Sequence, residues 1–362
     1  MGRTALPAPG DPPRFQLTLY KGIAVPRITR SIALALSAIA IPVALTGCGG
    51  DSGGATSTST RTEQVSLALD WYPNADHAGI ETAIVDQIAA GEGVQIDPSV
   101  PSDPTTNLMQ AAVGKKDLVI TYAPELLIAR AKGVPVKAVG ALVPVPLNSI
   151  IARTDRGITT PKDLEGKTVG IAGVPSDTAL LDTVLRSAGG DPAKVKTKVV
   201  GYSLSPALAA GKVDAIIGGY WNIEVPDLRA KGVPVNVFRL EDYGVPTYDE
   251  LVLAAGEDTI RDRPEAIRRA LAAIAKGTTA AQADPSAARA ALISANPDIA
   301  KGPLAAQLAA TLPLLVANGK PLGMNVAAWD ALAKWMKAKG LVTTEVSGSA
   351  AVDTTLLPEA SR

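Results

Sequence analysis

Side chains able to hold a flat polar molecule are concentrated in the stretch LDWYPNADHAG, residues 69–79. Aromatic residues make up only 4% of the chain, yet Trp71 and Tyr72 stand here beside Asn74 and the single histidine, His77. An indole face can stack on a planar ring, and an amide can both donate and accept hydrogen bonds. We therefore expect Trp71, Asn74 and His77 to contact a ligand; the alternative is a tryptophan in the core and a histidine that caps a helix.

A second aromatic side chain stands at the start of TYAPELL, residues 121–127. Tyr122 follows a strand that we expect over residues 118–121, and the next helix opens with Pro124. Glu125 falls in the first turn of this helix, where the helix dipole alone favours a carboxylate. Tyr122 and Glu125 are therefore candidate ligand contacts, although Glu125 also has an ordinary role at a helix N-terminus.

A third group, GGYWNIEVPD at residues 218–227, combines aromatic rings with a carboxylate. Its glycines allow a ligand to approach the backbone closely, and Tyr220, Trp221 and Glu224 follow them. Stacking would hold a heteroaromatic ring, while the carboxylate would accept N–H bonds or pair with a protonated ring nitrogen. These residues predict a site for a flat nitrogenous ring, unless the aromatic rings only pack the interior of a lobe.

Two further segments supply polar groups. The glycine-rich turn GIAGVPSDT, residues 170–178, places Ser176 before a helix, and Tyr248 lies in the segment YGVPTYDELVL. The turn has neither of the glycine spacings that bind nucleotide phosphates, which disfavours a nucleotide ligand. The sequence also contains no serine-elbow, HExxH or paired-cysteine motif, so we predict no catalytic residue, no metal site and no cofactor.

Each of these segments stands where a strand gives way to a helix. Short apolar runs alternate with amphipathic stretches from residue 65 onward, which is typical of an α/β fold with a parallel or mixed sheet. Ligands bind at the carboxyl ends of the strands in such sheets, so we expect the segments to converge. Residues 346–362 are mostly small or polar, and we expect them to form a flexible tail.

The composition restricts the class of partner. Lys and Arg together number 35, as do Asp and Glu, so the net charge is near zero and a nucleic-acid partner is not expected. A single cysteine excludes an internal disulfide. With 362 residues the chain is long enough for two lobes or domains, and we expect a monomer.

The N-terminal region has the layout of a bacterial export signal. Two arginines precede an apolar run at residues 31–45, which is shorter than the roughly 20 residues that a membrane-spanning helix needs. The run ends in Leu-Thr-Gly-Cys, which looks like a lipobox with Cys48 as the lipidated residue. We interpret residues 1–47 as the signal region, of which residues 1–24 resemble neither signal nor domain. Residues 48–62 would be a flexible tether, anchored on the outer face of the cytoplasmic membrane.

Five segments follow one another in an order found in a known family. They are LDWYPNADHAG, TYAPELLIARAKGVPVKAVGALVPVPLNSI, PKDLEGKTVGIAG, GKVDAIIGGYWNIE and YGVPTYDELVL. Over residues 64–340 the chain resembles the thiamine-precursor solute-binding proteins of ABC importers, a group related to sulfonate/taurine-type binding proteins and to yeast-type thiamine pyrimidine synthases. The opening motif and Gly-Gly-Tyr-Trp-Asn-x-Glu are specific, whereas PxDLxGKxVG is common to many solute-binding proteins.

The resemblance implies a periplasmic-binding-protein type II fold. In this fold two α/β lobes are joined by a two-strand hinge and close on the ligand between them. We expect the crossings near residues 149–153 and 250–253. Lobe 1 would then comprise residues 63–150 and 254–345, and lobe 2 would comprise residues 151–253.

The resemblance also implies a ligand and partners. The ligand is a thiamine pyrimidine, either 4-amino-5-hydroxymethyl-2-methylpyrimidine or its formylaminomethyl relative, and the partners are the permease and ATPase subunits of the importer. The ring would lie between Trp71 and either Tyr220 or Trp221, with Glu224 on its amino group and ring nitrogen. The remaining implied contacts, to the ring substituents and at the mouth, are Asn74, Tyr122 and His77.

Two alternatives stay open. The synthase branch resembles an enzyme with a lysine Schiff base to pyridoxal phosphate and a reacting histidine four residues later, but the matching positions here are Thr121 and Glu125. GVPTYDE, residues 244–250, also stands where that branch has a cysteine cluster, so an enzyme of this kind is not expected. A receptor for a sulfonate or another small anion would need an arginine or backbone donors in the cleft, and the motifs supply carboxylates instead.

Overall fold

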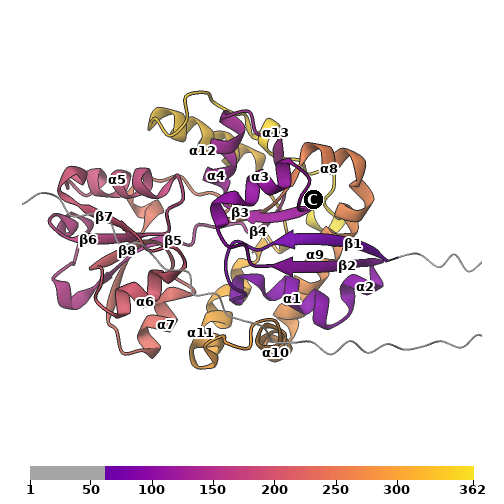
Figure 1. Ribbon diagram of the computed structural model, residues 1–362, viewed down its shortest axis with the longest axis horizontal. Coiled ribbons are helices and arrows are strands. Elements are labelled where there is room, and N and C mark those ends of the chain that lie inside the picture. The colour runs from indigo at the N-terminus through magenta and orange to yellow at the C-terminus, as the bar shows by residue number, and fades with distance from the viewer. Residues whose placement is uncertain (1–61) are drawn as a thin grey trace, which may run out of the picture. The chain divides into compact units, whose positions relative to one another are not determined.

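Two five-stranded sheets form the framework of residues 62–362, which are the residues that this computed structural model describes (Figure 1). The strands of the first sheet are β1 (Glu63–Ala68), β2 (Val94–Ser99), β3 (Leu118–Thr121), β4 (Val136–Val143) and β10 (Leu251–Gly256). Those of the second sheet are β5 (Asn148–Arg153), β6 (Thr168–Ile171), β7 (Lys196–Val199), β8 (Ala215–Tyr220) and β9 (Val235–Arg239). A short hairpin pairs β11 (Val316–Ala317) with β12 (Lys320–Pro321).

Both large sheets have the same mixed plan, with spatial orders β2-β1-β3-β10-β4 and β7-β6-β8-β5-β9. In the first sheet β1 is parallel to β2 and β3, while β10 is antiparallel to β3 and β4. In the second, β6 is parallel to β7 and β8, while β5 is antiparallel to β8 and β9. Every residue of β3 and β10 is buried, as expected for strands covered on both faces. The predicted α/β fold is confirmed.

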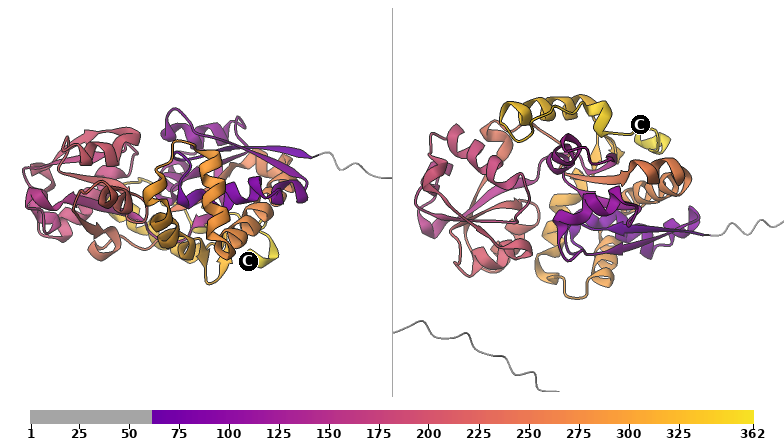
Figure 2. Two further views of the ribbon diagram at one scale, coloured as in Figure 1. Left: turned by 90° about the horizontal axis from the view of Figure 1, so that it is seen from below. Right: turned by 45° about the horizontal axis from the view of Figure 1, so that its top comes forward.

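Helices cover both sheets and define two lobes. Lobe 1, around the first sheet, carries α1 (Ala78–Val85), α2 (Ile88–Gly91), α3 (Asn107–Ala112), α4 (Ala123–Ala131), α8 (Glu257–Asp262), α9 (Pro264–Ala283), α10 (Pro285–Ala295), α11 (Lys301–Thr311), α12 (Val326–Ala338) and α13 (Gly348–Ala351). Lobe 2, around the second sheet, carries α5 (Asp177–Ser187), α6 (Leu204–Ala209) and α7 (Glu224–Ala230). In both views of Figure 2 the indigo N-terminal and the orange-to-yellow C-terminal segments share lobe 1.

Short 3-10 helices connect many of these elements. They are η1 (Ala75–His77), η2 (Pro104–Thr106), η3 (Thr154–Arg156), η4 (Pro161–Leu164), η5 (Pro192–Lys194), η6 (Gly201–Ser203), η7 (Leu240–Tyr243), η8 (Leu312–Leu314) and η9 (Glu359–Ser361). The turn η1 carries the middle of the LDWYPNADHAG stretch and leads directly into α1. This arrangement ends β1 and starts a helix within one short corner, as the sequence predicts.

The backbones of α1 and α9 touch at two glycines. A side-chain carbon at Gly277 would lie 2.1 Å from the carbonyl oxygen of Gly79, and one at Gly79 would lie 2.2 Å from Oγ1 of Thr278. Both distances are too short for a carbon atom, so only glycine allows this close approach. The last residue of LDWYPNADHAG therefore has a packing role, because it seats the start of α1 on a helix about 200 residues later in the chain.

The chain crosses between the lobes twice. Residues 144–147 lead from β4 into β5, and residues 244–250 lead from η7 into β10. The resemblance implies lobe borders a few residues further on, after residues 150 and 253. In the structure residues 148–150 belong to the second sheet, and residues 251–253 belong to the first. Both strands are buried almost throughout, so the pattern of burial along them does not mark where one lobe ends.

The C-terminal residues pack on lobe 1, which corrects the prediction of a flexible tail over residues 346–362. Val352 forms a bridge to Ala138 of β4, and the amide of Asp353 donates to the carbonyl of Ala138 at 2.8 Å. Leu356 and Leu357 are buried in the core of the lobe. β4 is the edge strand of the first sheet, and these residues cover its open edge and gain apolar contacts.

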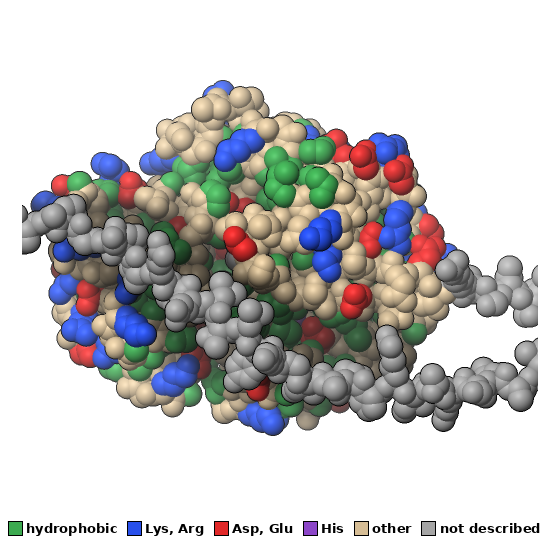
Figure 3. Space-filling model, in the orientation of Figure 1, with side chains coloured by type: hydrophobic (Ala, Val, Ile, Leu, Met, Phe, Trp, Pro, Cys, Tyr) green, Lys and Arg blue, Asp and Glu red, His purple; other side chains and the backbone are tan. Residues whose placement is uncertain are grey.

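Some predictions fall on other parts of the chain. The predicted signal region at residues 1–47, the predicted lipidation site Cys48 and all but the last residue of the predicted tether lie outside the described residues. Within residues 62–362, no helix combines the length and the apolar character needed to cross a membrane. On the visible face of these residues, acidic and basic side chains are interspersed (Figure 3).

Candidate ligand-binding site

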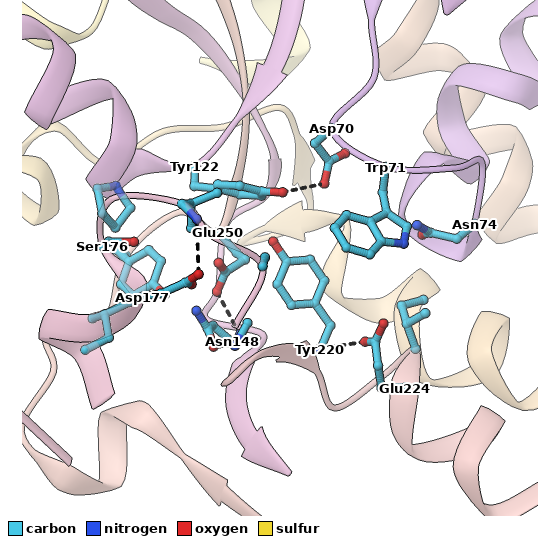
Figure 4. Close-up of a pocket in the computed structure, with 17 residues that line it drawn as sticks. Asp70, Trp71, Asn74, Tyr122, Asn148, Ser176, Asp177, Tyr220, Glu224 and Glu250 are labelled. Carbon is cyan, nitrogen blue, oxygen red and sulfur yellow. Dashed lines mark hydrogen bonds between the residues drawn. The ribbon is translucent and has the colours of Figure 1, made fainter. Parts of the chain in front are cut away.

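A cavity lies between the lobes, at the carboxyl ends of β1, β3, β6 and β8 (Figure 4). From lobe 1 it is lined by Asp70, Trp71, Asn74, Tyr122 and Pro124. From lobe 2 it is lined by two groups that follow β6 and β8: Ala172, Val174, Ser176, Asp177 and Leu180, then Gly218, Tyr220, Ile223 and Glu224. At the crossings it is lined by Asn148, Tyr248 and Glu250. The predicted convergence of the strand ends is therefore present.

Glu224 is held at the corner between β8 and α7. Its Oε2 accepts a hydrogen bond from the backbone amide of Tyr220 at 2.6 Å, because the strand ends at Tyr220 and the helix begins at Glu224. The other carboxyl oxygen points toward the side of the cavity where Trp71 and Asn74 lie (Figure 4). Burial raises the pKa of Glu224 to about 8, so this carboxyl carries its proton at neutral pH.

Two aromatic rings stand next to Glu224. Figure 4 shows Trp71 and Tyr220 entering the cavity from opposite lobes. The indole of Trp71 also meets Tyr202 of lobe 2 edge-on, with ring centroids 4.4 Å apart, and the Tyr202 hydroxyl donates to the carbonyl of Pro101 at 3.0 Å. Trp71 is thus fixed from across the cleft, and with Tyr220 it offers aromatic surface beside a carboxyl group.

Asp70 is the centre of a buried network at the end of β1. Its Oδ1 lies 3.0 Å from Nε2 of His77, and its Oδ2 accepts a hydrogen bond from the Tyr122 hydroxyl at 3.2 Å. The backbone amide of Asn74 donates to Nδ1 of His77 at 3.2 Å. Nδ1 is therefore the unprotonated nitrogen, so Nε2 carries the proton and donates to Asp70. Both oxygens of Asp70 are engaged within lobe 1.

Glu250 joins the two crossings. Its Oε2 accepts the backbone amides of Leu147 and Asn148 at 2.8 and 2.9 Å, so one crossing binds the backbone of the other. Oδ1 of Asn148 in turn accepts the amide of Gly218 at 2.9 Å. Burial raises the pKa of Glu250 to about 7, although its two amide bonds oppose that shift. This carboxyl sits at the base of the cavity, where the lobes meet.

Two more carboxyl groups fix the loop after β6. Oδ2 of Asp177 accepts the amides of Gly173 and Val174 at 2.8 and 3.1 Å. Oε1 of Glu125, from α4 of lobe 1, accepts the amide of Ser176 at 3.1 Å and so links the lobes. Burial raises the pKa of Asp177 to about 6 and that of Glu125 to about 7. The loop is thereby held at both its ends.

Most of the sequence-predicted residues meet at this cavity. Those that line it are Trp71, Asn74, Tyr122, Ser176, Tyr220, Glu224 and Tyr248. The Asn74 side chain is partly committed, because its Oδ1 accepts the amide of Asp76 at 2.9 Å and its Nδ2 donates to the carbonyl of Tyr72 at 3.1 Å. Asn74 therefore caps η1 and has little capacity left for a ligand.

Three predicted residues lie elsewhere. His77 is fully buried and bonds to Asp70, so it does not line a mouth. Glu125 lines a neighbouring cavity behind Tyr122 rather than the main one. Trp221 turns away from the cavity, and the guanidinium of Arg239 lies 4.7 Å from the centre of its ring. The alternation of side chains along the end of β8 sends Tyr220 and Trp221 to different faces.

Four polar lining residues were missed in the sequence: Asp70, Asn148, Asp177 and Glu250. Asp70 and Asp177 had a usable signal, since each directly follows or precedes a residue already singled out at a strand end. Asn148 and Glu250 had none, because they are 102 residues apart and only the fold shows that the two crossings touch.

The lining is acidic. Asp70, Asp177, Glu224 and Glu250 contribute four carboxyl groups, and none of the residues that line this cavity is Lys, Arg or His. No cluster of three or more His, Cys, Asp or Glu within residues 62–362 is arranged to hold a metal ion. Such a lining suits a ligand that presents N–H donors and disfavours an anion, because carboxyl groups accept hydrogen bonds and repel negative charge.

Comparison with known proteins assigns the chain to a family. The model of the family described as NMT1/THI5 like matches residues 74–288, which begin within the LDWYPNADHAG corner, at Asn74, and include the GGYWNIE segment. The chain belongs to the NMT1/THI5-like family. The resemblance read from the five segments is thereby confirmed.

Named relatives of this NMT1/THI5-like protein include a binding protein and a synthase. A formylaminopyrimidine-binding protein from Halalkalibacterium halodurans is 34% identical over 282 residues, which cover 76% of this chain and 85% of that protein. A 4-amino-5-hydroxymethyl-2-methylpyrimidine phosphate synthase from Legionella pneumophila is 26% identical over 243 residues, which cover 67% of this chain and 76% of the synthase. The chain is thus similar both to a binding protein and, at lower identity, to an enzyme.

Solved structures agree on the architecture. The alkanesulfonate-binding protein SsuA from Xanthomonas axonopodis pv. citri, solved with MOPS bound, matches with a TM-score of 0.63. The match covers 80% of this chain and 98% of SsuA at 18% sequence identity. At this identity the similarity concerns the fold alone. It confirms the predicted solute-binding-protein fold of two α/β lobes for this NMT1/THI5-like chain.

Proposed function

We propose that this protein is the extracytoplasmic receptor of an ABC importer and that it binds a thiamine pyrimidine precursor. The observation that carries the proposal is Glu224, a carboxyl fixed by the Tyr220 amide beside the rings of Trp71 and Tyr220, in a cavity lined by carboxyl groups and by no basic side chain. The 34% identity to a formylaminopyrimidine-binding protein over 76% of the chain supports the same ligand class.

A 4-aminopyrimidine edge complements Glu224. Such an edge presents an amino N–H donor next to a ring nitrogen that accepts, and a protonated carboxyl presents one acceptor next to one donor. The free oxygen of Glu224 would donate its proton to the ring nitrogen, and Oε2, which already accepts the Tyr220 amide, would accept the amino N–H with its second lone pair. Stacking on Trp71 and Tyr220 would hold the ring in the plane of these bonds. The Tyr220 amide fixes the carboxyl, so little conformational freedom is lost on binding.

A sulfonate or another small anion is a weaker candidate. SsuA shares the fold, but an anion in this cavity would face four carboxyl groups without an arginine, lysine or histidine from the lining residues. Loss of water from the anion would then have no compensating charge. The same lining favours a neutral ring that donates hydrogen bonds.

The enzyme alternative also has little support in the site. Thr121 stands at the end of β3, and His77, the single histidine, is buried against Asp70. No lining residue of the cavity pairs a nucleophile with a base. The lower identity to the synthases, 26% for the Legionella enzyme, agrees with a binding function.

The proposal includes an anchor and partners. Lipidation of Cys48 would hold the protein on the outer face of the cytoplasmic membrane, and residues 48–62 would serve as a tether. The receptor would act as a monomer and pass its ligand to the permease and ATPase subunits of the importer.

Calorimetry on the purified protein tests the function. We expect 4-amino-5-hydroxymethyl-2-methylpyrimidine or its formylaminomethyl relative to bind with a Kd of about 1 µM or tighter, and taurine to give no heat of binding. Mass spectrometry should return the ligand unchanged after incubation. Binding of taurine without binding of either pyrimidine would assign the anion function, and a modified pyrimidine would assign an enzyme.

A further inference from the structure

A buried polar contact outside the cavity joins the two corners that carry its aromatic rings. Asn222 belongs to lobe 2 and lies between Tyr220, the last residue of β8, and Glu224, the first residue of α7. Its Nδ2 donates to Oδ1 of Asp76, in the turn η1 of lobe 1, at 2.7 Å, and to Oγ1 of Thr311, in α11, at 2.7 Å. All three side chains are buried, so the lobes meet here without water.

Two oxygens of this contact have no partner. Oδ2 of Asp76 and Oδ1 of Asn222 are buried and form no hydrogen bond within residues 62–362. Both are acceptors while Asp76 is ionised, and buried polar atoms are almost always paired. A proton on Oδ2 of Asp76 would turn this oxygen into a donor, and Oδ1 of Asn222 belongs to the amide that Asp76 already binds. One proton can therefore satisfy both oxygens.

The surroundings of Asp76 favour this proton. Burial raises the pKa of Asp76 to about 7, and the carboxyl groups of Asp70 and Glu250 act in the same direction. His77 and the hydrogen bond from Asn222 act in the opposite direction without cancelling the rise. The carboxyl of Asp76 can therefore hold a proton close to neutral pH.

The other elements packed on η1 add no fixed cation. They are α1, α10, α11 and β4, and their charged side chains are Glu81, Arg289, Lys301 and Lys137. Lys301 is exposed, and Arg289 donates to the carbonyl of Lys301 at 3.2 Å. Within residues 62–362 none of the three basic side chains forms an ion pair with Asp76. Glu224, across the contact in lobe 2, contributes another carboxyl group.

We propose that Asp76 and Asn222 are a positioning pair that shares one proton when the lobes are closed. The proton comes from the solvent, binds Oδ2 of Asp76 and is donated to Oδ1 of Asn222. The pair acts through its neighbours, because it holds the corner of Trp71 against the corner of Tyr220 and Glu224. The inference goes beyond the proposed function by linking closure of the lobes to uptake of a proton, although its binding test rests on that function.

This link has a definite sign. With the lobes apart, Asp76 loses Asn222 and meets water, so its pKa returns toward the ordinary value of 3.8. The contribution of the pair to closure is therefore complete below pH 3.8 and is lost as the pH rises through about 7. Between pH 6 and pH 8 this loss corresponds to about tenfold in the affinity for a ligand that binds the closed form.

Asp76→Asn tests the shared proton, because an amide N–H then stands where the proton would lie and can bind Asn222 at every pH. Calorimetry with the formylaminomethyl pyrimidine should give a Kd within about threefold of the wild type at pH 6. The loss of affinity between pH 6 and pH 8 should be about tenfold smaller in Asp76→Asn than in the wild type. Groups that titrate in both proteins, such as Glu224, cancel from this comparison. Asp86→Asn, an exposed change just after α1, should keep the wild-type profile.

Equal pH profiles of the wild type and Asp76→Asn would overturn the shared proton and leave the proposed function in place. A Kd of Asp76→Asn at pH 6 more than tenfold weaker than that of the wild type would overturn it as well. If the wild type does not bind the pyrimidine, the proposed function fails, and urea unfolding without ligand decides on the pair. The midpoint should then fall further between pH 6 and pH 8 in the wild type than in Asp76→Asn, and parallel midpoints would overturn the pair.

Discussion

Asp70 and Glu224 carry the same functional group at comparable places, one after β1 in lobe 1 and the other after β8 in lobe 2, yet their oxygens are used differently. Asp70 gives one oxygen to His77 and the other to Tyr122, so the carboxylate is consumed by its own lobe. Glu224 gives one oxygen to the Tyr220 amide and turns the other toward the cavity. A carboxyl group that lines the cavity is therefore available to a ligand only if the protein leaves one of its oxygens unengaged.

We infer from this difference that the carboxyl groups of the two lobes have different roles, structural in lobe 1 and ligand-binding in lobe 2. In lobe 1 the Asp70 network fixes the position of the Tyr122 ring and of the corner that carries Trp71. In lobe 2 a backbone amide donates to one oxygen of Glu224 and of Asp177, and the other oxygen of each carboxyl remains available to a ligand. Substitutions in the first lobe should therefore act mainly on stability, and substitutions in the second should act mainly on affinity.

The largest effect is expected from Asp70→Ala. This change leaves the His77 N–H and the Tyr122 hydroxyl without an acceptor, and each buried orphan costs about 1–3 kcal/mol. The free energy of unfolding in urea at pH 7 should fall by about 2–5 kcal/mol. Asp298→Ala, at an exposed position, should change it by less than about 0.5 kcal/mol. An Asp70→Ala protein that keeps its stability but binds the ligand more weakly would contradict the structural role of Asp70.

Glu224→Met should act on affinity instead. Methionine is similar in length but offers neither a donor to a ring nitrogen nor an acceptor to the amino group. We expect a loss of about 1.5–3 kcal/mol in pyrimidine binding, which is at least tenfold in Kd. Calorimetry measures this directly, with Glu345→Met at an exposed position as the matched control. Unchanged affinity would remove Glu224 from the binding site.

The strand-to-helix corners are the part of the site that the sequence predicts well. An apolar run followed by Trp71, by Tyr122 or by Tyr220 marks the carboxyl end of a strand, and the fold brings such ends together. Periodicity reports local structure and the class of fold. It does not report which way a side chain turns after the strand has ended, which is why Tyr220 and Trp221 could not be told apart.

The residues whose roles the sequence did not predict, or predicted wrongly, are positioned by contacts between segments that are distant in the chain. Glu250 binds amides that precede it by 102 and 103 residues, and the packing of the C-terminal residues depends on an open edge at β4. His77 has ordinary ligand chemistry, but Asp70 and the Asn74 amide use both ring nitrogens. These hydrogen-bond partners are set by the tertiary structure and cannot be predicted from a single sequence.

The pH dependence of stability should also report on the carboxyl of Glu224. The folded-state pKa of Glu224 is about 8, against an ordinary value of 4.5, so the unfolded chain loses this proton first as the pH rises. Its contribution to stability is complete below about pH 4.5 and is lost as the pH approaches 8. Between pH 6 and pH 8 the wild type should lose about 2 kcal/mol more than Glu224→Gln in urea unfolding. Parallel pH profiles of the two proteins would contradict the raised pKa.

The smallest effect is expected from Tyr122→Phe, which removes one hydrogen bond of 3.2 Å and leaves the ring in place. The free energy of unfolding should fall by about 0.5–1.5 kcal/mol, while Tyr72→Phe, at a side chain that is 51% exposed, should have no measurable effect. The same change made in Asp70→Ala should cost nothing or restore some stability, because the hydroxyl has then already lost its acceptor. A coupling of about 1 kcal/mol between the two changes would show that Asp70 acts through Tyr122, whereas strict additivity would mean that the network is absent in solution.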